Sequence, residues 1–236
     1  MHTSTGNHML DGFSHSLQSR LLTHAERVTL PQHRILCESG ETPRYVYFLT
    51  RGLCSVVVTM QSGGSAEVSM CGKEGLVCAH SLLGAQPSPA ASFMQITGEG
   101  FRIPHRVAEA LFAESEEFRT HVMAWIQMSI YVSLQTSACG LLHEAEQRLA
   151  RWLLMSSDRT ESDTLPLTQE FLAEMLGTQR TTVAVVAGEL RRKGLIDYVR
   201  GNVTILDRKG LSHAACECYN VSQQAILQLN RESVAA

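Results

Sequence analysis

Residues 168–190 of the chain read TQEFLAEMLGTQRTTVAVVAGEL, and this stretch decides the fold. Four apolar positions in it have the spacing of two helices that cross at a steep angle and bury one face each: Leu172, Leu176, Val183 and Val186. Thr168 precedes the first helix and can cap its free amide groups. Gly177 lies between the helices, where the chain needs a positive φ that glycine adopts without a steric penalty. The stretch therefore predicts two short helices joined by a sharp turn.

The second predicted helix begins with five residues whose side chains can form hydrogen bonds: Thr178, Gln179, Arg180, Thr181 and Thr182. In a helix-turn-helix protein, the start of the second helix enters the major groove of DNA and contacts base edges and phosphates there. An ordinary pair of antiparallel core helices has the same apolar spacing. The residues that follow must therefore distinguish the two interpretations.

The sequence after the second helix predicts a β-hairpin. Residues 191–194 read RRKG, which places cations at the negative end of the helix dipole and a glycine where the helix stops. Residues 195–206 then alternate apolar and polar side chains on both sides of Arg200, Gly201 and Asn202, as two short strands around a tight turn do. A helix-turn-helix followed by a hairpin is a winged helix, which favours double-stranded DNA as the partner.

Five segments extend this pattern along the chain: YVYFLTRG at 45–52, GKEGLV at 72–77, RLARWLL at 148–154, LPLTQEFL at 165–172 and TILDRKGL at 204–211. With them, the chain resembles the Crp/Fnr family of bacterial transcription regulators from about residue 17 to residue 219. The resemblance implies an α+β fold with an N-terminal β-roll of the cyclic-nucleotide-binding-like, jelly-roll type, a long dimerisation helix and a C-terminal winged helix-turn-helix. The implied domains are 17–114 for the β-roll, 115–139 for the dimerisation helix, 140–212 for the Crp-type winged helix-turn-helix and 213–236 for a C-terminal tail.

The composition agrees with a DNA-binding protein of the cell interior. The net charge is −3, but residues 148–209 hold ten Arg and Lys against eight Asp and Glu, so a modest positive charge falls on the predicted winged helix. The N-terminus lacks the basic start and apolar core of a signal peptide, and no apolar run approaches the roughly 18–20 residues of a membrane span. Seven cysteines, an odd number, favour reduced thiols. We therefore expect a cytoplasmic protein with no membrane partner.

Residues 27–103 are rich in short β-type runs broken by turns. Six runs are predicted strands: 28–30, 35–37, 45–50, 54–60, 66–70 and 93–97. Residues 61–65 read QSGGS, which is typical of a hairpin turn between two of them. Strands at this spacing indicate a sandwich or β-roll. Residues 1–16 are expected to lack stable structure, with a short helix at 16–24 after them.

The period becomes helical between about residues 115 and 137. Seven positions recur at alternating steps of four and three, as in a heptad seam: Phe118, Val122, Trp125, Ser129, Val132, Thr136 and Cys139. A helix packed on its own domain has the same period, but the family resemblance favours a coiled coil that forms a homodimer through residues 115–139. Gly140 is expected to end this helix and residues 139–142 to form a hinge. An amphipathic helix at 143–155 and a polar linker at 158–165 are expected to follow.

The segment that binds cyclic AMP in relatives lacks its key cation here. Those relatives have a Gly-Glu pair whose Glu binds the ribose, and further along an Arg that neutralises the cyclic phosphate. This chain has Glu74 in the corresponding segment but no Arg between Lys73 and Arg102. Because a phosphate without its cation is costly to bury, the sequence argues against cyclic AMP as the effector.

Cys78 and His80 lie in the same segment, where the haem-based carbon-monoxide sensors of the family carry a Cys-x-His-Ser as iron ligands. Haem bound by these two residues is therefore one hypothesis for the effector site, and a buried thiol with no ligand role is the alternative. The other cysteines are too scattered in the sequence to form the local thiolate set of an iron–sulfur cluster. Cys216 and Cys218 have no partners at metal-ligand spacing, so no metal site is expected.

The family pattern carries over to DNA contacts residue by residue. Arg180 matches the recognition-helix arginine that contacts guanine in relatives. Thr181 stands where many relatives have Glu, and Val185 where many have a second Arg, so the usual half-site of the family is in doubt. Val185 can instead contact a thymine methyl group. Phosphate contacts are expected from Thr168, Gln169, Gln179, Thr182 and Arg200, and Thr178 completes the DNA-binding set.

No catalytic site is predicted. A β-roll resembles the barrel of cupin metalloenzymes, but the ten histidines include no His-x-His pair to bind a metal. No Ser/His/Asp set and no phosphate-binding Gly-rich loop is visible either. We therefore expect a non-enzymatic, sequence-specific DNA-binding regulator that also contacts RNA polymerase. A regulator that binds DNA constitutively, with the β-roll as a scaffold, stays an open alternative.

Overall fold

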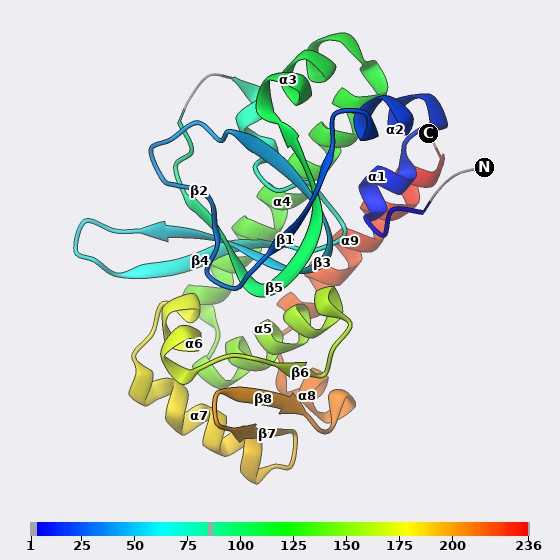
Figure 1. Cartoon of the computed structure of the whole chain (residues 1–236). Coiled ribbons are helices and arrows are strands. Elements are labelled where there is room, and N and C mark those ends of the chain that lie inside the picture. The colour runs from blue at the N-terminus through cyan, green and yellow to red at the C-terminus, as the bar shows by residue number, and fades with distance from the viewer. Residues whose placement is uncertain (1–3, 85–86, 236) are drawn as a thin grey trace. The chain divides into compact units, whose positions relative to one another are not determined.

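The computed structural model describes residues 4–84 and 87–235 (Figure 1). The chain divides into two compact units. The first unit contains the residues up to Val56, Ser69–Tyr131 and the residues from Ala225, and the second contains Val57–Val68 and Val132–Gln224. Within the described ranges, no helix combines the length and the apolar content that crossing a membrane requires.

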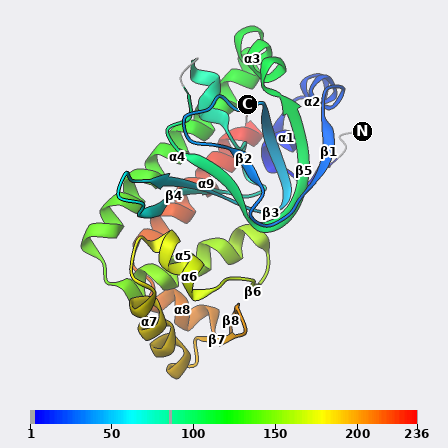
Figure 2. The ribbon, with the colours of Figure 1, turned by 60° about the vertical axis from the view of Figure 1, so that its left-hand side comes forward.

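An antiparallel sheet forms the frame of the first unit, and its strands are β1 (Glu26–Leu30), β2 (Ile35–Cys37), β3 (Tyr45–Thr59), β4 (Ser65–Cys71) and β5 (Ala91–Pro104). The strand order is β1-β5-β3-β4, and β2 also pairs with β5. The long strand β5 therefore pairs with β2 near its start and with β1 further along; Figure 2 gives a second view of these strands. The predicted β-roll class is confirmed.

Two predicted strands, 45–50 and 54–60, form the single strand β3. Gly52 lies at the predicted break and has a φ of 86°, so the strand bends there without ending. A Cβ at Gly98 of β5 would collide with the backbone carbonyl of Arg51, which means that the two strands cross too closely for any residue but glycine. The bend, and not a turn, explains the polar interruption in the sequence.

The N-terminal segment is ordered, so the expectation that residues 1–16 lack structure is wrong for residues 4–16; residues 1–3 lie outside the described part. Helix α1 (His8–Gly12) is capped by Asn7, whose Oδ1 accepts from the Leu10 amide at 2.9 Å. The Asn7 side chain is fully buried and its Nδ2 donates to the carbonyl oxygens of Leu49 and Gly75. The elements that follow are α2 (His15–Leu22), η1 (Ala79–Leu83) and α3 (His105–Glu114).

Helix α4 runs over Glu116–Leu142, so Gly140 does not end it and no hinge forms at residues 139–142. The predicted heptad seam is buried within the chain itself at its five apolar or thiol positions: Phe118, Val122, Trp125, Val132 and Cys139. The expectation that this seam forms a dimer interface is therefore wrong. A second stripe on α4 is more than half exposed: Met123, Ile130, Leu134 and Leu141.

The second unit contains α5 (Ala145–Thr160), α6 (Gln169–Leu176), α7 (Arg180–Arg192), α8 (Arg208–Ala214) and the start of α9 (Cys218–Ala235), with a three-stranded sheet of β6 (Thr164–Leu165), β8 (Asn202–Ile205) and β7 (Ile196–Val199). The expected linker at 158–165 is instead the end of α5 and strand β6. The C-terminal segment, expected to be a tail, is helical from Cys218. Trp152 and Leu153 of α5 are buried.

Candidate DNA-binding site and sensor site

The predicted helix-turn-helix is present as α6 and α7, which pack against each other and against α5. The Thr168 hydroxyl caps α6 by accepting a hydrogen bond from the Phe171 amide at 3.2 Å. Gly177 ends α6 with a φ of 58°, the left-handed conformation expected from the sequence. After the turn, Gln179 is extended, and α7 begins at Arg180.

The apolar faces of the two helices are as predicted at three positions and shifted at one. Leu172, Leu176 and Val183 are buried, whereas Val186 is only half-buried. Ala187 and Leu190 fill the buried positions of α7 instead: Val183, Ala187 and Leu190 recur at steps of four and three and so lie on one helix face.

The start of α7 is exposed, as the DNA-binding hypothesis requires. Gln179, Arg180 and Thr181 are exposed, and Val185, one turn after Thr181, is 62% exposed. Among the described residues, the Arg180 guanidinium takes part in no ion pair and no hydrogen bond. The first amides of α7 also carry the partial positive charge of a helix N-terminus, which favours phosphate groups nearby.

The β7–β8 hairpin forms the predicted wing. Arg200 and Gly201 have φ values of 49° and 79°, which is the two-residue turn that matches the twist of the flanking strands. Asn202 pairs with Val199, so it begins β8 and does not belong to the turn. A Cβ on Gly201 would stand 3.6 Å from the Thr168 methyl carbon. The fold thus brings the wing turn, with the exposed Arg200, next to the first residue of the helix-turn-helix.

The other predicted phosphate contacts lie around the start of the two helices. Thr168 is exposed, and Gln169, Thr178 and Thr182 are half-buried. The Thr181 hydroxyl donates to the Gln179 side-chain oxygen at 3.5 Å, which links two residues of the exposed edge. The candidate DNA-binding residues therefore come from one cap, one turn, one helix start and one hairpin.

The cations at the far end of α7 form ion pairs. Arg191 pairs with Asp197 at 2.9 Å, and Lys193 pairs with Glu146 at 2.5 Å. Arg192 lies 3.5 Å from Glu189. These cations are therefore partly neutralised by their partners, whereas Arg180 and Arg200 are exposed and neither forms an ion pair among the described residues.

The three candidate effector residues lie in the first unit and have separate partners. Glu74 is buried, and its carboxylate accepts a hydrogen bond from the Gly72 amide at 3.1 Å. His80 is half-buried and its Nε2 lies 3.0 Å from the Ser88 hydroxyl; burial lowers the pKa of its imidazole. Glu74 and His80 therefore each interact with a different neighbouring residue, Gly72 and Ser88.

Cys78 is buried in a left-handed conformation with a φ of 66°, directly before η1. Its hydrogen bond with the Cys37 thiol, together with burial, raises the pKa of Cys78. The same hydrogen bond lowers the pKa of Cys37. A non-glycine residue in this conformation is strained, and such strain often marks a functional site.

A further cluster, not predicted from the sequence, lies in the second unit and consists of Cys139, His143, Cys216 and Cys218. The Cys-x-Cys pair was its only signal. The other two members could not be found from spacing, because Cys139 is 77 positions from Cys216.

Two family models match the chain: the cyclic nucleotide-binding domain over residues 27–115 and the Crp-like helix-turn-helix domain over residues 147–214. A comparison with curated protein sequences found no match. Among solved structures, the regulator FixK2 from Bradyrhizobium japonicum has a TM-score of 0.69 at 14% identity, with 81% of this chain and 98% of that chain covered.

Two further solved structures are similar. A transcriptional regulator of the CRP family from Thermus thermophilus has a TM-score of 0.67 at 21% identity, with 80% of this chain and 96% of that chain covered. The c-di-GMP responsive global regulator CLP from Xanthomonas campestris has a TM-score of 0.67 at 16% identity, with 81% of this chain and 99% of that chain covered. The structures support the fold, and the two family models together cover more than half of the sequence. The chain belongs to the Crp/Fnr family of DNA-binding transcription regulators, which are not enzymes.

Proposed function

We propose that the chain is a homodimeric regulator that recognises a specific operator with the start of α7. The observation that carries this proposal is the exposed Arg180, which begins the helix and has no ion pair among the described residues. A guanidinium in this position can bind guanine O6 and N7 with two hydrogen bonds, which contributes about 1–3 kcal/mol of discrimination. Val185, which is also exposed on α7, adds an apolar contact suited to a thymine methyl group.

Genome-wide mapping of fragments bound by the purified chain would supply an operator, and anisotropy titrations would then compare operator with random DNA. Arg180→Ala is expected to lose about 5- to 150-fold in affinity for the operator and much less for random DNA. Arg192→Ala is the matched control, because that exposed arginine lies at the other end of α7 beside Glu189. Equal losses of Arg180→Ala on both DNAs would refute direct base recognition.

The exposed stripe of α4 supports the homodimer. Met123, Ile130, Leu134 and Leu141 recur at steps of seven and four, which is the spacing of an apolar seam between two helices. Burial of such a stripe against the same stripe of a second copy would remove apolar surface from water. The resulting dimer would supply two copies of α7, one for each of two half-sites about 34 Å apart. The dimer therefore uses the opposite face of α4 from the one predicted.

For the sensor, we propose an effector other than cyclic AMP. The chain has no arginine between Lys73 and Arg102 to neutralise a cyclic phosphate, and the Glu74 carboxylate accepts from its own loop at Gly72. Calorimetry with cyclic AMP is expected to give no heat of specific binding. Saturable binding with a change in operator affinity would contradict this.

Haem is one candidate effector, because the backbone of Cys78 is in a strained conformation and Cys78 lies close in sequence to His80. Ligation would require Cys78 to leave Cys37 and His80 to leave Ser88. Addition of haem to the purified chain tests this idea: a Soret band that Cys78→Ser and His80→Ala both alter would support it, and no Soret band would exclude it.

A regulator without an effector is the remaining alternative. If small-molecule extracts of cells leave operator binding unchanged, the chain binds DNA constitutively. Contact with RNA polymerase is proposed from family membership alone.

A further inference from the structure

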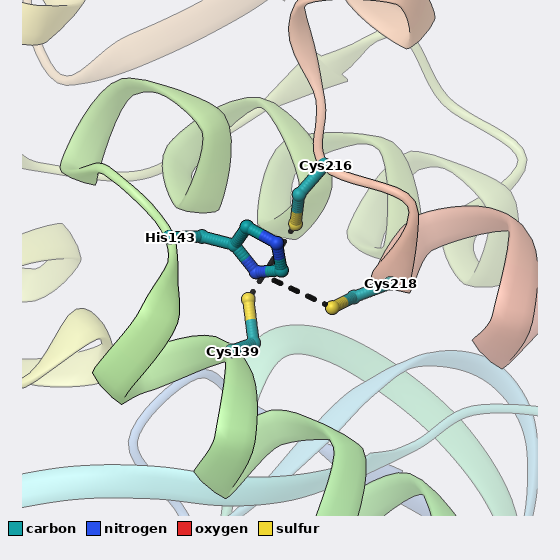
Figure 3. A group of neighbouring side chains, drawn as sticks. All are labelled: Cys139, His143, Cys216 and Cys218. Atoms are coloured by element: carbon teal, nitrogen blue, oxygen red, sulfur yellow. Dashed lines mark hydrogen bonds between the residues drawn. The ribbon is translucent and has the colours of Figure 1, made fainter.

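Four potential metal ligands converge in the second unit (Figure 3). Cys139 lies in the last turn of α4, His143 directly follows α4, Cys216 precedes α9 and Cys218 begins it. The three thiols and one nitrogen of the imidazole all lie within 4.8 Å of one another. All three cysteines are buried and reduced, and the His143 side chain is 17% exposed.

We propose that Cys139, His143, Cys216 and Cys218 bind one Zn²⁺ ion in a four-coordinate Cys₃His site. Zinc is the cation that such a mixed set of thiolates and imidazole selects. Because all four positions are filled by protein atoms, the ion has no open position for a substrate, and its role is structural. This site is separate from both the DNA-binding residues and the sensor residues.

Two of the distances between the ligand atoms are close to the edges of a tetrahedral zinc site, and the whole set lies within 4.8 Å. With Zn–S of about 2.3 Å and Zn–N of about 2.0–2.1 Å, the edges of the tetrahedron are about 3.8 Å for sulfur to sulfur and about 3.5 Å for sulfur to nitrogen. The Cys139 and Cys216 sulfurs are 3.5 Å apart, and the Cys218 sulfur is 3.6 Å from His143 Nδ1. A disulfide between the two thiols would instead require about 2.05 Å.

Groups around the four side chains are those that support a metal ligand. His143 Nε2 lies 3.1 Å from the Glu217 carboxylate, so the carboxylate fixes the ring with Nδ1 facing the thiols. Gln135 Nε2 donates to the Cys218 sulfur at 3.0 Å, a hydrogen bond that stabilises a thiolate. Such outer partners orient ligands and typically raise metal affinity about 10- to 100-fold.

The local charge also fits. Three thiolates and one Zn²⁺ ion leave a net charge of −1 in a largely buried site. Arg151 is buried, with 5% of its surface exposed, and its positive charge acts on Cys139. A buried arginine beside a cluster of thiols compensates the excess negative charge that zinc alone would leave.

An ion in this site would join two segments that are 77 positions apart. The helix-turn-helix and the wing lie in the sequence between them, so zinc would close the whole DNA-binding part of the second unit into one loop. Because the ligands come together only in the folded chain, the binding free energy of the metal adds to the stability of this unit.

The test begins with the full-length chain purified under reducing conditions. Elemental analysis after gel filtration is expected to find about one zinc per chain in the wild type and in Cys54→Ala, whose buried cysteine lies in β3 outside the cluster. Cys139→Ser and Cys216→Ser are expected to lose it. X-ray absorption is expected to give three sulfur neighbours at about 2.3 Å and one nitrogen at about 2.0 Å.

Two measurements do not depend on the folding of a ligand variant. Reduced, metal-free wild type titrated with Co²⁺ is expected to develop the charge-transfer and visible bands of a tetrahedral thiolate site. Glu217→Gln keeps all four ligands, so it is expected to give the same spectrum with an affinity about 10- to 100-fold weaker.

Several results would overturn the proposal. The first is that the reduced chain takes up neither Zn²⁺ nor Co²⁺. The second is that Cys54→Ala loses zinc as readily as Cys139→Ser does. The third is that Cys139 and Cys216 form a disulfide and the chain does not bind metal. None of these results bears on Arg180 and operator recognition, so the two proposals can fail separately.

Discussion

The indole N–H of Trp125 donates a hydrogen bond of 2.9 Å to the carbonyl oxygen of Leu76. This contact commits one face of α4 to its own chain. A Cβ at Gly75 would collide with the same indole ring, so the loop before Leu76 is shaped to receive it. The free face of α4 is therefore the one that carries Ile130 and Leu134.

Leu134→Glu is expected to convert the dimer to a monomer, because a carboxylate in an apolar seam between two helices would be buried without a partner. Size-exclusion chromatography with light scattering measures the mass. Met60→Glu is the control: Met60 is 64% exposed and Leu134 is 66% exposed, but Met60 lies outside α4. A Leu134→Glu protein that stays dimeric would show that the dimer uses another surface.

Trp125→Ala is expected to lower the free energy of unfolding by about 3–5 kcal/mol, since it removes a buried aromatic side chain and leaves a cavity. It also leaves the Leu76 carbonyl without its donor. Urea denaturation followed by circular dichroism measures the change. Met123→Ala lies on the exposed stripe of the same helix; with both substitutions made in the monomeric Leu134→Glu background, it is expected to change stability by about 0.5 kcal/mol or less. Equal effects of the two substitutions would contradict the assignment of the buried face.

Arg200→Ala is expected to weaken binding to operator and random DNA by similar factors, because a phosphate contact carries no sequence information. The slope of log K against log salt is expected to become shallower by about one. Anisotropy titrations over a range of salt concentrations measure both quantities. If Arg200→Ala instead altered the preferred sequence, the wing would contact bases and not the backbone.

His80 is expected to make stability depend on pH. Burial holds the pKa of its imidazole below the ordinary 6.5, so the unfolded chain takes up the proton first as the pH falls. The contribution to stability is complete above pH 6.5 and is lost as the pH drops below that value toward the folded-state pKa. Urea unfolding at several pH values is expected to give a steeper decline for wild type than for His80→Gln. An NMR titration of His80 with a pKa at or above 6.5 would contradict this.

The sequence by itself determined the helix-turn-helix, the wing and the general course of the β-roll. These features are encoded locally. Gly177 and Gly201 both have positive φ values at their turns, as the sequence pattern required, and the apolar positions recur with the period of a helix or a strand. Residues close in sequence are close in space within such elements, so their spacing alone predicts the exposed Arg180.

Only the tertiary structure decided which face of α4 is buried. A heptad period is the same whether a helix packs on its own chain or on a second copy, and the Trp125–Leu76 contact joins residues 49 positions apart. It also decided the Cys139, His143, Cys216 and Cys218 cluster. Two pairs of ligands on distant segments meet because the whole second unit folds between them, and no local pattern of residues records such a meeting.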